Sequence, residues 1–423
     1  MLSPMCNLST AAAGTRDVHS LSLRVMSRRR HPPVVLSSSS SRCHRRNHLI
    51  ATRASVNTKP RGDVKHAEAK MIERDVLRMG IPSKGRMAED TLDLLSSSQL
   101  SVKKLNPRQY AAKMPAMGDK MEVWFQRASD VVRKVRSGDF DIGILGYDMF
   151  AEFGEGADDL VVVHDALRFG ECYLALAVPN YGATAGVNSL DELLAMPCWT
   201  EENPLRVVTG YQYLAKTFFE NVGFENVALV AGDGALEAAP AMGSADIILD
   251  LVSTGTTLRE NNLKEIEGGR VVESQGVLVA NRKSLLERDG CLETVHEMLE
   301  RLEAHLEAKK LFTVVANMRG SSAEDVASLV MSCDSLKGLQ GPTVAPVYTP
   351  GADGKPEVNM YAVTICAQKA TLYDSVKALR DIGGSGVLVS PLTYVFDEEP
   401  ARWNLLLDEL GMEHDPIRGK EKR

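Results

Sequence analysis

Four hydroxyl side chains and one glycine stand together in the order Ser253, Thr254, Gly255, Thr256 and Thr257. A loop of this composition that opens a helix offers backbone N–H groups and hydroxyl donors to a single phosphate. The apolar run 247–252, interrupted by Asp250, predicts a buried strand directly before the loop. A carboxylate at the carboxyl end of that strand could hold the hydroxyls of a sugar whose phosphate occupies the loop. The alternative is a Ser/Thr-rich turn that caps a helix, with Asp250 as an ordinary polar residue.

A second loop of the phosphate-binding type lies near the start of the apolar part of the chain. Lys84 and Arg86 flank Gly85 where a predicted strand at 76–82 gives way to a predicted helix at 87–96. This is not a Walker loop, because the chain has no GxxxxGK[ST]. A solvated turn is the alternative. Arg127, which follows a predicted strand at 122–126, either borders the same pocket or makes a salt bridge at a helix start.

The stretch 233–258 resembles the phosphoribosyl-pyrophosphate segment of the ATP phosphoribosyltransferases, the enzymes of the first step of histidine biosynthesis. The resemblance rests on Glu-Ala-Ala-Pro at 237–240, Ala-Asp at 245–246 and Asp-Leu-Val-Ser-Thr-Gly at 250–255. Ile-Pro-Ser-Lys-Gly-Arg at 81–86 is similar to the N-terminal signature of that family. The matches extend over roughly residues 76–410 and indicate the long form of the enzyme, of the plant and algal plastid type.

The resemblance implies a role for each motif. Asp250 and Glu237 are expected to be catalytic and to hold the ribose hydroxyls or metal. The expected phosphate ligands in phosphoribosyl pyrophosphate binding are Ser253, Thr254, Gly255, Thr256 and Thr257, and the expected nucleotide-binding residues are Lys84, Gly85, Arg86 and Arg127. Family members carry an acid two residues after the last loop threonine, whereas this chain has Arg259 followed by Glu260. No role is therefore assigned to Arg259 or Glu260 from the resemblance.

The implied reaction transfers a phosphoribosyl group to N1 of ATP, with release of pyrophosphate. An oxocarbenium-like transition state needs alignment of the nucleophile and neutralisation of the leaving group, which Mg²⁺ bound mainly through pyrophosphate would supply. No catalytic Ser/His/Asp or Cys/His set is therefore expected. His164, at a predicted strand end, and His296, on the predicted exposed stripe of a helix at 295–308, receive no role.

Short strands alternate with helices up to residue 308, which predicts an α/β fold with parallel sheets covered on both faces. The order of the predicted elements indicates that the chain forms part of a first lobe, then the whole of a second lobe, and then returns to the first. We expect lobe I at 75–165 and 270–308 and lobe II at 166–269. The resemblance implies a two-lobed, periplasmic-binding-protein-like catalytic region with the active site between its lobes.

Residues 311–412 change pattern to βαββαβ, the order of the ferredoxin-like (ACT-like) fold. In long-form members of the family this domain binds histidine and mediates feedback inhibition. Gly341, Thr343 and Ser385 fall in the segments that match the histidine site, although each segment could equally be a plain turn. The tail after Glu413 is charged and is expected to be disordered.

Composition narrows the classes of protein further. Residues 1–60 carry ten basic side chains and one acid, whereas the whole chain of 423 residues has a formal charge of −7. An Arg- and Ser-rich segment nearly free of acids predicts a disordered transit peptide at residues 1–65 and a location in the chloroplast stroma. The alternative is a basic tail that binds nucleic acid or lipid. The acidic remainder is a poor general nucleic-acid binder.

Apolar runs stay well short of the ~18 residues of a membrane span. The seven scattered cysteines contain no CxxC pair and predict neither a disulfide framework nor a zinc site. The resemblance to the family implies a homo-oligomer, either a dimer or a hexamer. A solute-binding protein and a non-catalytic regulatory relative are the rival classes. A phosphoribosyltransferase for another base is disfavoured, because Leu249 rather than a second acid precedes Asp250.

Overall fold

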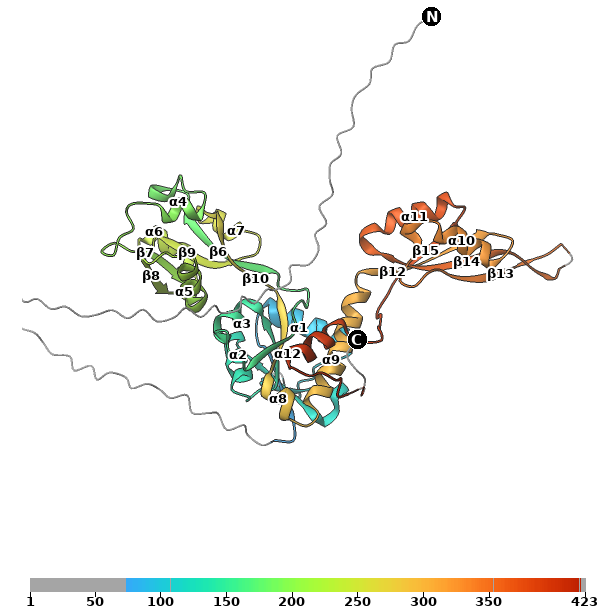
Figure 1. The fold of residues 1–423 in the computed structure, drawn as a ribbon, viewed down its shortest axis with the longest axis horizontal. Coiled ribbons are helices and arrows are strands. Elements are labelled where there is room, and N and C mark those ends of the chain that lie inside the picture. The colour runs from blue at the N-terminus through green and yellow to red at the C-terminus, as the bar shows by residue number, and fades with distance from the viewer. Residues whose placement is uncertain (1–73, 107, 353, 418, 420–423) are drawn as a thin grey trace, which may run out of the picture. The chain divides into compact units, whose positions relative to one another are not determined.

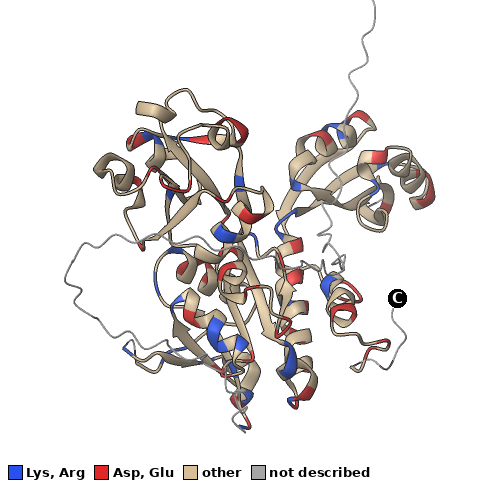
Figure 2. Cartoon of the chain, turned by 60° about the vertical axis from the view of Figure 1, so that its left-hand side comes forward, with Lys and Arg blue, Asp and Glu red and all other residues tan. Residues whose placement is uncertain are grey.

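The computed structural model describes residues 74–106, 108–352, 354–417 and 419. The predicted transit peptide therefore lies outside the described residues. The described chain forms three β-sheets, each with its own helices (Figure 1). Acidic and basic residues are interspersed along its elements (Figure 2). Within these residues, every helix is too short or too polar to cross a bilayer.

The first sheet is six-stranded and mixed. Its strands, in spatial order, are β2 (Ala111–Lys113), β3 (Met121–Gln126), β1 (Leu77–Pro82), β4 (Ile142–Gly146), β11 (Gly276–Asn281) and β5 (Leu160–His164). Its helices are α1 (Arg86–Ser97), α2 (Ala128–Arg136), α3 (Tyr147–Gly154), α8 (Arg282–Glu287) and α9 (Cys291–Ala308). Strand β11 is buried on both faces, because Leu278 and Ala280 enter one core while Val277 and Val279 enter the other.

The second sheet is five-stranded. Its strands, in spatial order, are β10 (Leu263–Ser274), β6 (Cys172–Pro179), β9 (Ile247–Val252), β7 (Leu205–Thr209) and β8 (Val227–Ala231). Its helices are α4 (Leu190–Leu194), α5 (Gln212–Asn221), α6 (Ala239–Met242) and α7 (Thr256–Glu260). The prediction of purely parallel sheets is wrong. Strand β6 runs antiparallel to β9 and to β10, because the chain enters this lobe along β6 and leaves it along β10.

Two crossings of the chain connect the two sheets. The first runs from β5 to β6, and the second runs from β10 to β11, which pairs antiparallel with β4 and β5 of the first sheet. The second lobe is thus inserted into the first. The two-lobed fold class that the sequence predicts is confirmed.

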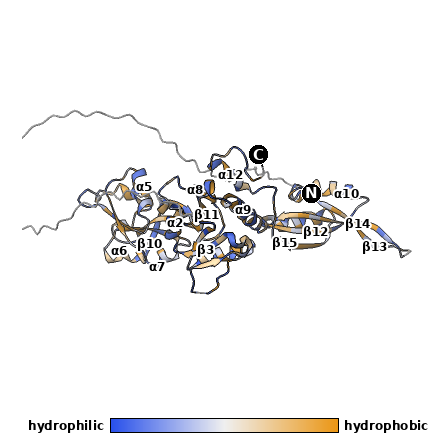
Figure 3. Ribbon diagram, turned by 90° about the horizontal axis from the view of Figure 1, so that it is seen from below, coloured by the Kyte–Doolittle hydropathy of each residue, from blue (hydrophilic) through white to orange (hydrophobic). Residues whose placement is uncertain are grey.

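The third sheet forms the C-terminal domain. Its elements follow the chain as β12 (Leu311–Arg319), α10 (Ala323–Met331), β13 (Thr343–Pro350), β14 (Pro356–Gln368), α11 (Leu372–Asp381) and β15 (Ser385–Pro391). The spatial order β13-β14-β12-β15 is that of the ferredoxin-like fold, as predicted. Both helices cover the same face of the sheet (Figure 1), and hydrophobic stretches follow its strands (Figure 3).

The end of the chain departs from the predicted domain boundary. Helix α12 (Ala401–Glu409) packs on β5 and α9, and it places Trp403, Leu406 and Leu407 in the core of the first lobe. Residues 401–412 therefore belong to that core, not to the C-terminal domain predicted to reach residue 412. The expectation of a disordered tail after Glu413 is also wrong up to residue 417. Asp415 is buried and accepts a hydrogen bond from the indole of Trp403 at 3.1 Å.

Candidate active site

The Ser/Thr/Gly loop follows β9 as the sequence predicts, and α7 begins inside it at Thr256. Gly255 precedes the helix with φ +66°, a left-handed conformation that favours glycine. The hydroxyls of Thr254 and Thr256 lie 3.0 Å apart, and both residues are exposed. Ser253 and Thr257 are exposed too, and their hydroxyls bond to no other side chain in the described part of the chain. The loop therefore presents polar groups that the protein leaves largely unsatisfied.

Asp250 lies within β9, three residues before the loop, and is partly buried. Burial raises the pKa of its carboxyl group, against a smaller lowering by the N–H of Leu251, and the negative charge of Glu237 adds a still smaller raising of the pKa. Glu237 is held on the short helix η3 (Leu236–Ala238), which Ala235 starts with a left-handed φ of +49°. Two carboxylates thus act on one another beside the loop.

These carboxylates fit the predicted Mg²⁺ only as part of a larger ligand set. Among the described residues, no cluster of three or more His, Cys, Asp or Glu side chains could hold a metal. Mg²⁺ takes carboxylate oxygens together with substrate phosphates. The raised pKa of Asp250 indicates a site where a cation would favour the ionised carboxylate. The donor set therefore suits a metal that arrives mainly through the pyrophosphate.

The predicted nucleotide-binding residues gather at one edge of the first sheet. Strands β1 and β3 are parallel neighbours that end together at Pro82 and Gln126, and the N–H of Ser83 donates to the Gln126 carbonyl at 2.8 Å. Residues that follow these ends must lie close to one another; they are Lys84, Gly85, Arg86 and Arg127. Gly85 has φ +74°, and the three cations are exposed.

Lys84, Arg86 and Arg127 make neither a hydrogen bond nor an ion pair with another described side chain. Arg127 therefore does not make the salt bridge at the start of a helix that was the alternative interpretation of this residue. Arg127 precedes α2 without capping it. Three uncompensated positive charges at one sheet edge suit an anionic ligand such as a nucleotide triphosphate.

A buried network between the lobes was missed by the sequence analysis. Asp148 of α3 accepts the Tyr211 hydroxyl at 2.8 Å and the Ser274 hydroxyl at 2.7 Å. Glu152, one turn later, accepts the N–H groups of Tyr213 and Leu214 at 3.0 Å each, so it caps α5 of the other lobe. These bonds connect α3 to the insertion at two places, the start of α5 and the end of β10, where the chain returns to the first lobe.

Tyr211 also relates this network to the candidate site. Burial raises the pKa of its phenol, followed by the charge of Asp148, and Asp250 contributes in the same sense. Tyr211 is 6 % exposed and stays protonated, so it acts as a hydrogen-bond donor. Residues 148 and 211 are 63 positions apart, and no local pattern predicts their pairing.

The predicted histidine-site residues are not brought together within one chain. Thr343 begins β13 and Ser385 begins β15, and these strands form the two opposite edges of the sheet. Three inter-strand spacings separate the edges, which is roughly 14 Å. Gly341 lies before β13 with φ +105°, so it stays on the Thr343 side. One free amino acid cannot contact Thr343 and Ser385 of the same chain.

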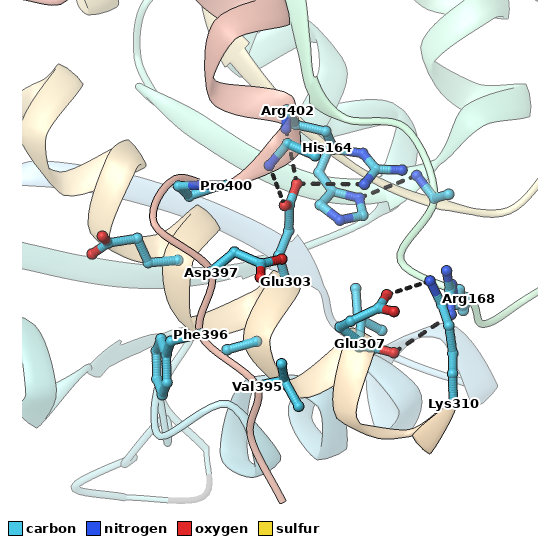
Figure 4. A pocket seen from close by; sticks show the side chains of 15 residues that line it. His164, Arg168, Glu303, Glu307, Lys310, Val395, Phe396, Asp397, Pro400 and Arg402 are labelled. Carbon is cyan, nitrogen blue, oxygen red and sulfur yellow. Dashed lines mark hydrogen bonds and ion pairs between the residues drawn. The ribbon is translucent and has the colours of Figure 1, made fainter. Parts of the chain in front are cut away.

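The two histidines without an assigned role are both buried. His296 is 6 % exposed, so its predicted position on an exposed stripe is wrong; its Nε2 lies 2.6 Å from Glu399 and its ring packs edge-on against Trp403. His164 is 1 % exposed and lines a cavity of about 180 Å³ beside α9 (Figure 4). None of the residues lining that cavity belongs to the Ser/Thr/Gly loop or to the Lys-Gly-Arg edge.

The fold and the two loops together define a class: a two-lobed enzyme for phosphorylated substrates with a small α+β domain attached. Two family models match the chain, ATP phosphoribosyltransferase over residues 127–304 and the HisG C-terminal domain over residues 308–394. The chain belongs to the ATP phosphoribosyltransferase family and is an enzyme of the pentosyltransferase class.

Named relatives agree with this membership. The chain is 60 % identical over 342 residues to ATP phosphoribosyltransferase 2, chloroplastic, of Arabidopsis thaliana, which covers 81 % of this chain and 82 % of the relative. It is 58 % identical over 364 residues to ATP phosphoribosyltransferase 1, chloroplastic, of the same plant, covering 86 % and 88 %. A solved ATP phosphoribosyl transferase (HisG:HisZ) complex from Thermotoga maritima is similar with a TM-score of 0.43 and 24 % identity, over 54 % of this chain and 96 % of that one.

Proposed function

We propose that the enzyme transfers the phosphoribosyl group of phosphoribosyl pyrophosphate to N1 of ATP, giving N1-(5-phosphoribosyl)-ATP and pyrophosphate. This is the first step of histidine biosynthesis. The observation that carries the proposal is Asp250 in β9 followed by an exposed, unsatisfied Ser/Thr/Gly loop, in a chain of this family. The loop holds the 5-phosphate, and Asp250 with Glu237 holds the ribose hydroxyls.

The first lobe contributes the nucleotide site in this proposal. Lys84, Gly85, Arg86 and Arg127 bind ATP through uncompensated charge and the open backbone of a left-handed glycine. Asp250 and Glu237 would hold Mg²⁺ together with the pyrophosphate, and the metal would supply neutralisation of charge on the leaving group. The chain's own task is alignment, because the adenine nitrogen and the anomeric carbon must meet in line.

The positions of the expected groups explain why no nucleophilic side chain is required. Asp250 is held beside Glu237, and its raised pKa falls again when a cationic centre develops next to it. A carboxylate beside the anomeric carbon stabilises an oxocarbenium-like transition state more than the ground state. The phenol of Tyr211, kept protonated by burial and by Asp148, supports the site from the start of α5.

Feedback inhibition by histidine through the C-terminal domain is the regulatory part of the proposal. Thr343 and Ser385 lie on opposite sheet edges, so a histidine site built from both, with Gly341, requires two copies of the chain. The edge strand β15 exposes Leu388 by 66 % and Val389 by 40 %. Unpaired, apolar edge strands favour association. A homo-oligomer, either a dimer or a hexamer assembled from dimers, fits both observations.

The Arg- and Ser-rich segment 1–65 is proposed to act as a transit peptide that delivers the enzyme to the chloroplast stroma. Support comes from its composition and from the chloroplastic names of the two Arabidopsis relatives. Sequencing the N-terminus of protein isolated from plastids tests this. A mature start between about residue 52 and residue 70 supports it, whereas a start at Met1 or Leu2 contradicts it.

The experiment that tests the reaction is pyrophosphate release from phosphoribosyl pyrophosphate, with Mg²⁺ and ATP omitted in turn. We expect release only when all components are present, and a fall in the rate when histidine is added. Release without sensitivity to histidine would keep the reaction and remove the regulatory role. Binding of phosphoribosyl pyrophosphate without any release would favour a solute-binding protein and contradict the proposal.

A further inference from the structure

The side chain of Arg259 folds back onto the Ser/Thr/Gly loop. Its Nη2 lies 3.3 Å from the Thr256 hydroxyl and 3.4 Å from the Thr254 carbonyl. Both contacts are long for hydrogen bonds and both use one nitrogen. The guanidinium has five N–H donors in all, and its Nε and Nη1 make no hydrogen bond with any other described residue. Most of its donors are therefore available at the rim of the loop.

Several carboxylates lie near the loop. The loop residues themselves carry no charge, while Asp250 and Glu237 act on one another beside them. Glu265 of β10 adds a third carboxylate, since its Oε1 lies 3.6 Å from the position of a Cβ atom on Gly255. A phosphate monoester carries close to two negative charges at neutral pH. Within the described residues, Arg259 is the cation that hydrogen-bonds to this loop.

We propose that Arg259 is a further substrate-binding residue, whose guanidinium pairs with the phosphate ester held by residues 253–257. This rests on the proposed function, because it takes the loop to be the phosphate site. Arginine meets phosphate oxygens with two parallel N–H groups, and it needs only to turn its free Nε and Nη1 edge toward the ligand. It supplies the positive charge that a loop of hydroxyls and amides lacks.

The alternative is that Arg259 only stabilises the conformation of the loop. Two substitutions distinguish this structural role from phosphate binding. Arg259→Lys keeps the charge, whereas Arg259→Gln keeps a polar side chain with N–H donors but removes the charge. Both variants are prepared in the full chain. Lys216→Gln is the matched control: it removes one exposed charge from α5 of the same lobe, away from the loop.

The measurements are the Kd of ribose 5-phosphate by titration calorimetry and the KM of phosphoribosyl pyrophosphate against kcat. We expect Arg259→Gln to raise Kd and KM about tenfold, as loss of one charge-assisted contact would, with kcat within about twofold. Arg259→Lys keeps the charge but loses the paired N–H groups, so its loss should be smaller than that of Arg259→Gln, and Lys216→Gln should match the wild type. Melting temperatures check that each variant is folded.

Three results would overturn the inference. Arg259→Gln with wild-type Kd and KM means that Arg259 does not meet the phosphate. Loss in Arg259→Lys with retention in Arg259→Gln means that it braces the loop instead. Equal losses in Arg259→Gln and Lys216→Gln mean a general electrostatic effect. A wild-type protein that neither binds ribose 5-phosphate nor releases pyrophosphate would instead contradict the proposed function, on which the inference depends.

Discussion

Two regions differ in whether their polar groups have partners within the protein. One is the Ser/Thr/Gly loop, and the other is the junction between α9 and the returning C-terminal segment. At the loop, the exposed hydroxyls of Thr254 and Thr256 contact each other, and Thr256 has one further long contact from Arg259. At the junction, Glu303 of α9 accepts the N–H groups of Ala401 and Arg402 at 2.7 and 3.2 Å and so caps α12. Arg402 also pairs with Asp165 at 2.5 Å. Its second ion pair, with Glu303 at 3.4 Å, is seen in Figure 4.

The difference separates a place for a ligand from a structural joint. A buried charge is tolerated when it is paired, and at the junction the charged walls of the cavity pair with each other, as Lys310 does with Glu307. Such a site gains little from a further ligand. At the loop, the hydroxyls are left to solvent and the charge of Glu237 acts on the partly buried Asp250, so these groups stay available to a ligand.

His164 is the exception at the junction. Its Nδ1 accepts the Ala166 N–H at 3.1 Å, while Nε2 is buried without a partner among the described residues. Burial, helped by the charge of Arg402, lowers the pKa of His164 to about 3, so the ring is neutral and Nε2 carries the proton. The adjoining cavity of about 180 Å³ has room for an ordered water that accepts from it.

The largest effect is expected where the returning segment enters the core. Trp403→Ala removes a side chain that is 0 % exposed, and we expect a loss of about 3–5 kcal/mol in the free energy of unfolding. Leu405→Ala on the same helix is the control, because Leu405 is 66 % exposed, and its cost should stay within about 0.5 kcal/mol. Urea denaturation measures both. Equal stabilities would contradict the placement of α12 in the first lobe.

At the loop the effect should fall on activity instead. Asp250→Ala is expected to lower kcat/KM by roughly a hundredfold to a thousandfold, the range for loss of one preorganised contact to a transition state, with the melting temperature kept. Glu220→Ala, an exposed acid on α5, serves as the control and should change nothing. If kcat/KM of the Asp250 variant stayed within a few-fold of wild type, the assignment of Asp250 would fail.

A smaller effect is expected from uncapping α12. Glu303→Ala leaves two helix N–H groups and Arg402 with fewer partners, which should cost about 1–2 kcal/mol of unfolding free energy without changing kcat. Glu297→Ala provides the comparison, because Glu297 makes an ordinary i,i+4 pair with Arg301 and should cost about 0.3–0.5 kcal/mol. Similar losses in both variants would remove the special role of Glu303.

The smallest expected effect is a pH dependence of the free energy of unfolding that comes from Asp250. The pKa of Asp250 is higher in the folded protein than the ordinary aspartate value of 3.8, so folding favours the protonated form. Above the folded pKa the ionised carboxylate destabilises the native state, and Asp250→Asn should be more stable than the wild type. The advantage should vanish below about pH 3.8, where both states are protonated. Unfolding free energies measured at pH 7 and at the lowest pH that preserves the fold test this; an Asn variant less stable at pH 7 would contradict it.

Local patterns were enough to predict the loop and the overall fold class. The apolar run before Ser253, the Lys-Gly-Arg turn after β1 and the βαββαβ order of the last domain depend on neighbours in sequence. The pairing of Asp148 with Tyr211 and the capping of α12 by Glu303 join residues 63 and 98 positions apart, and a single sequence carries no signal for them. Helix α12 was not predicted. Its apolar side chains Trp403, Leu406 and Leu407 pack on the core of the first lobe, from which the whole C-terminal domain separates them in the sequence.

Amide hydrogen exchange of the full chain, with and without phosphoribosyl pyrophosphate and Mg²⁺, tests the contrast between the two regions most directly. Exchange reports which backbone segments a ligand stabilises. We expect new protection over residues 250–259 and around Glu237, with no change over α9 and residues 392–417. Protection at the α9 junction, with exchange in the loop unaltered, would contradict the account and move the substrate site to the cavity beside His164.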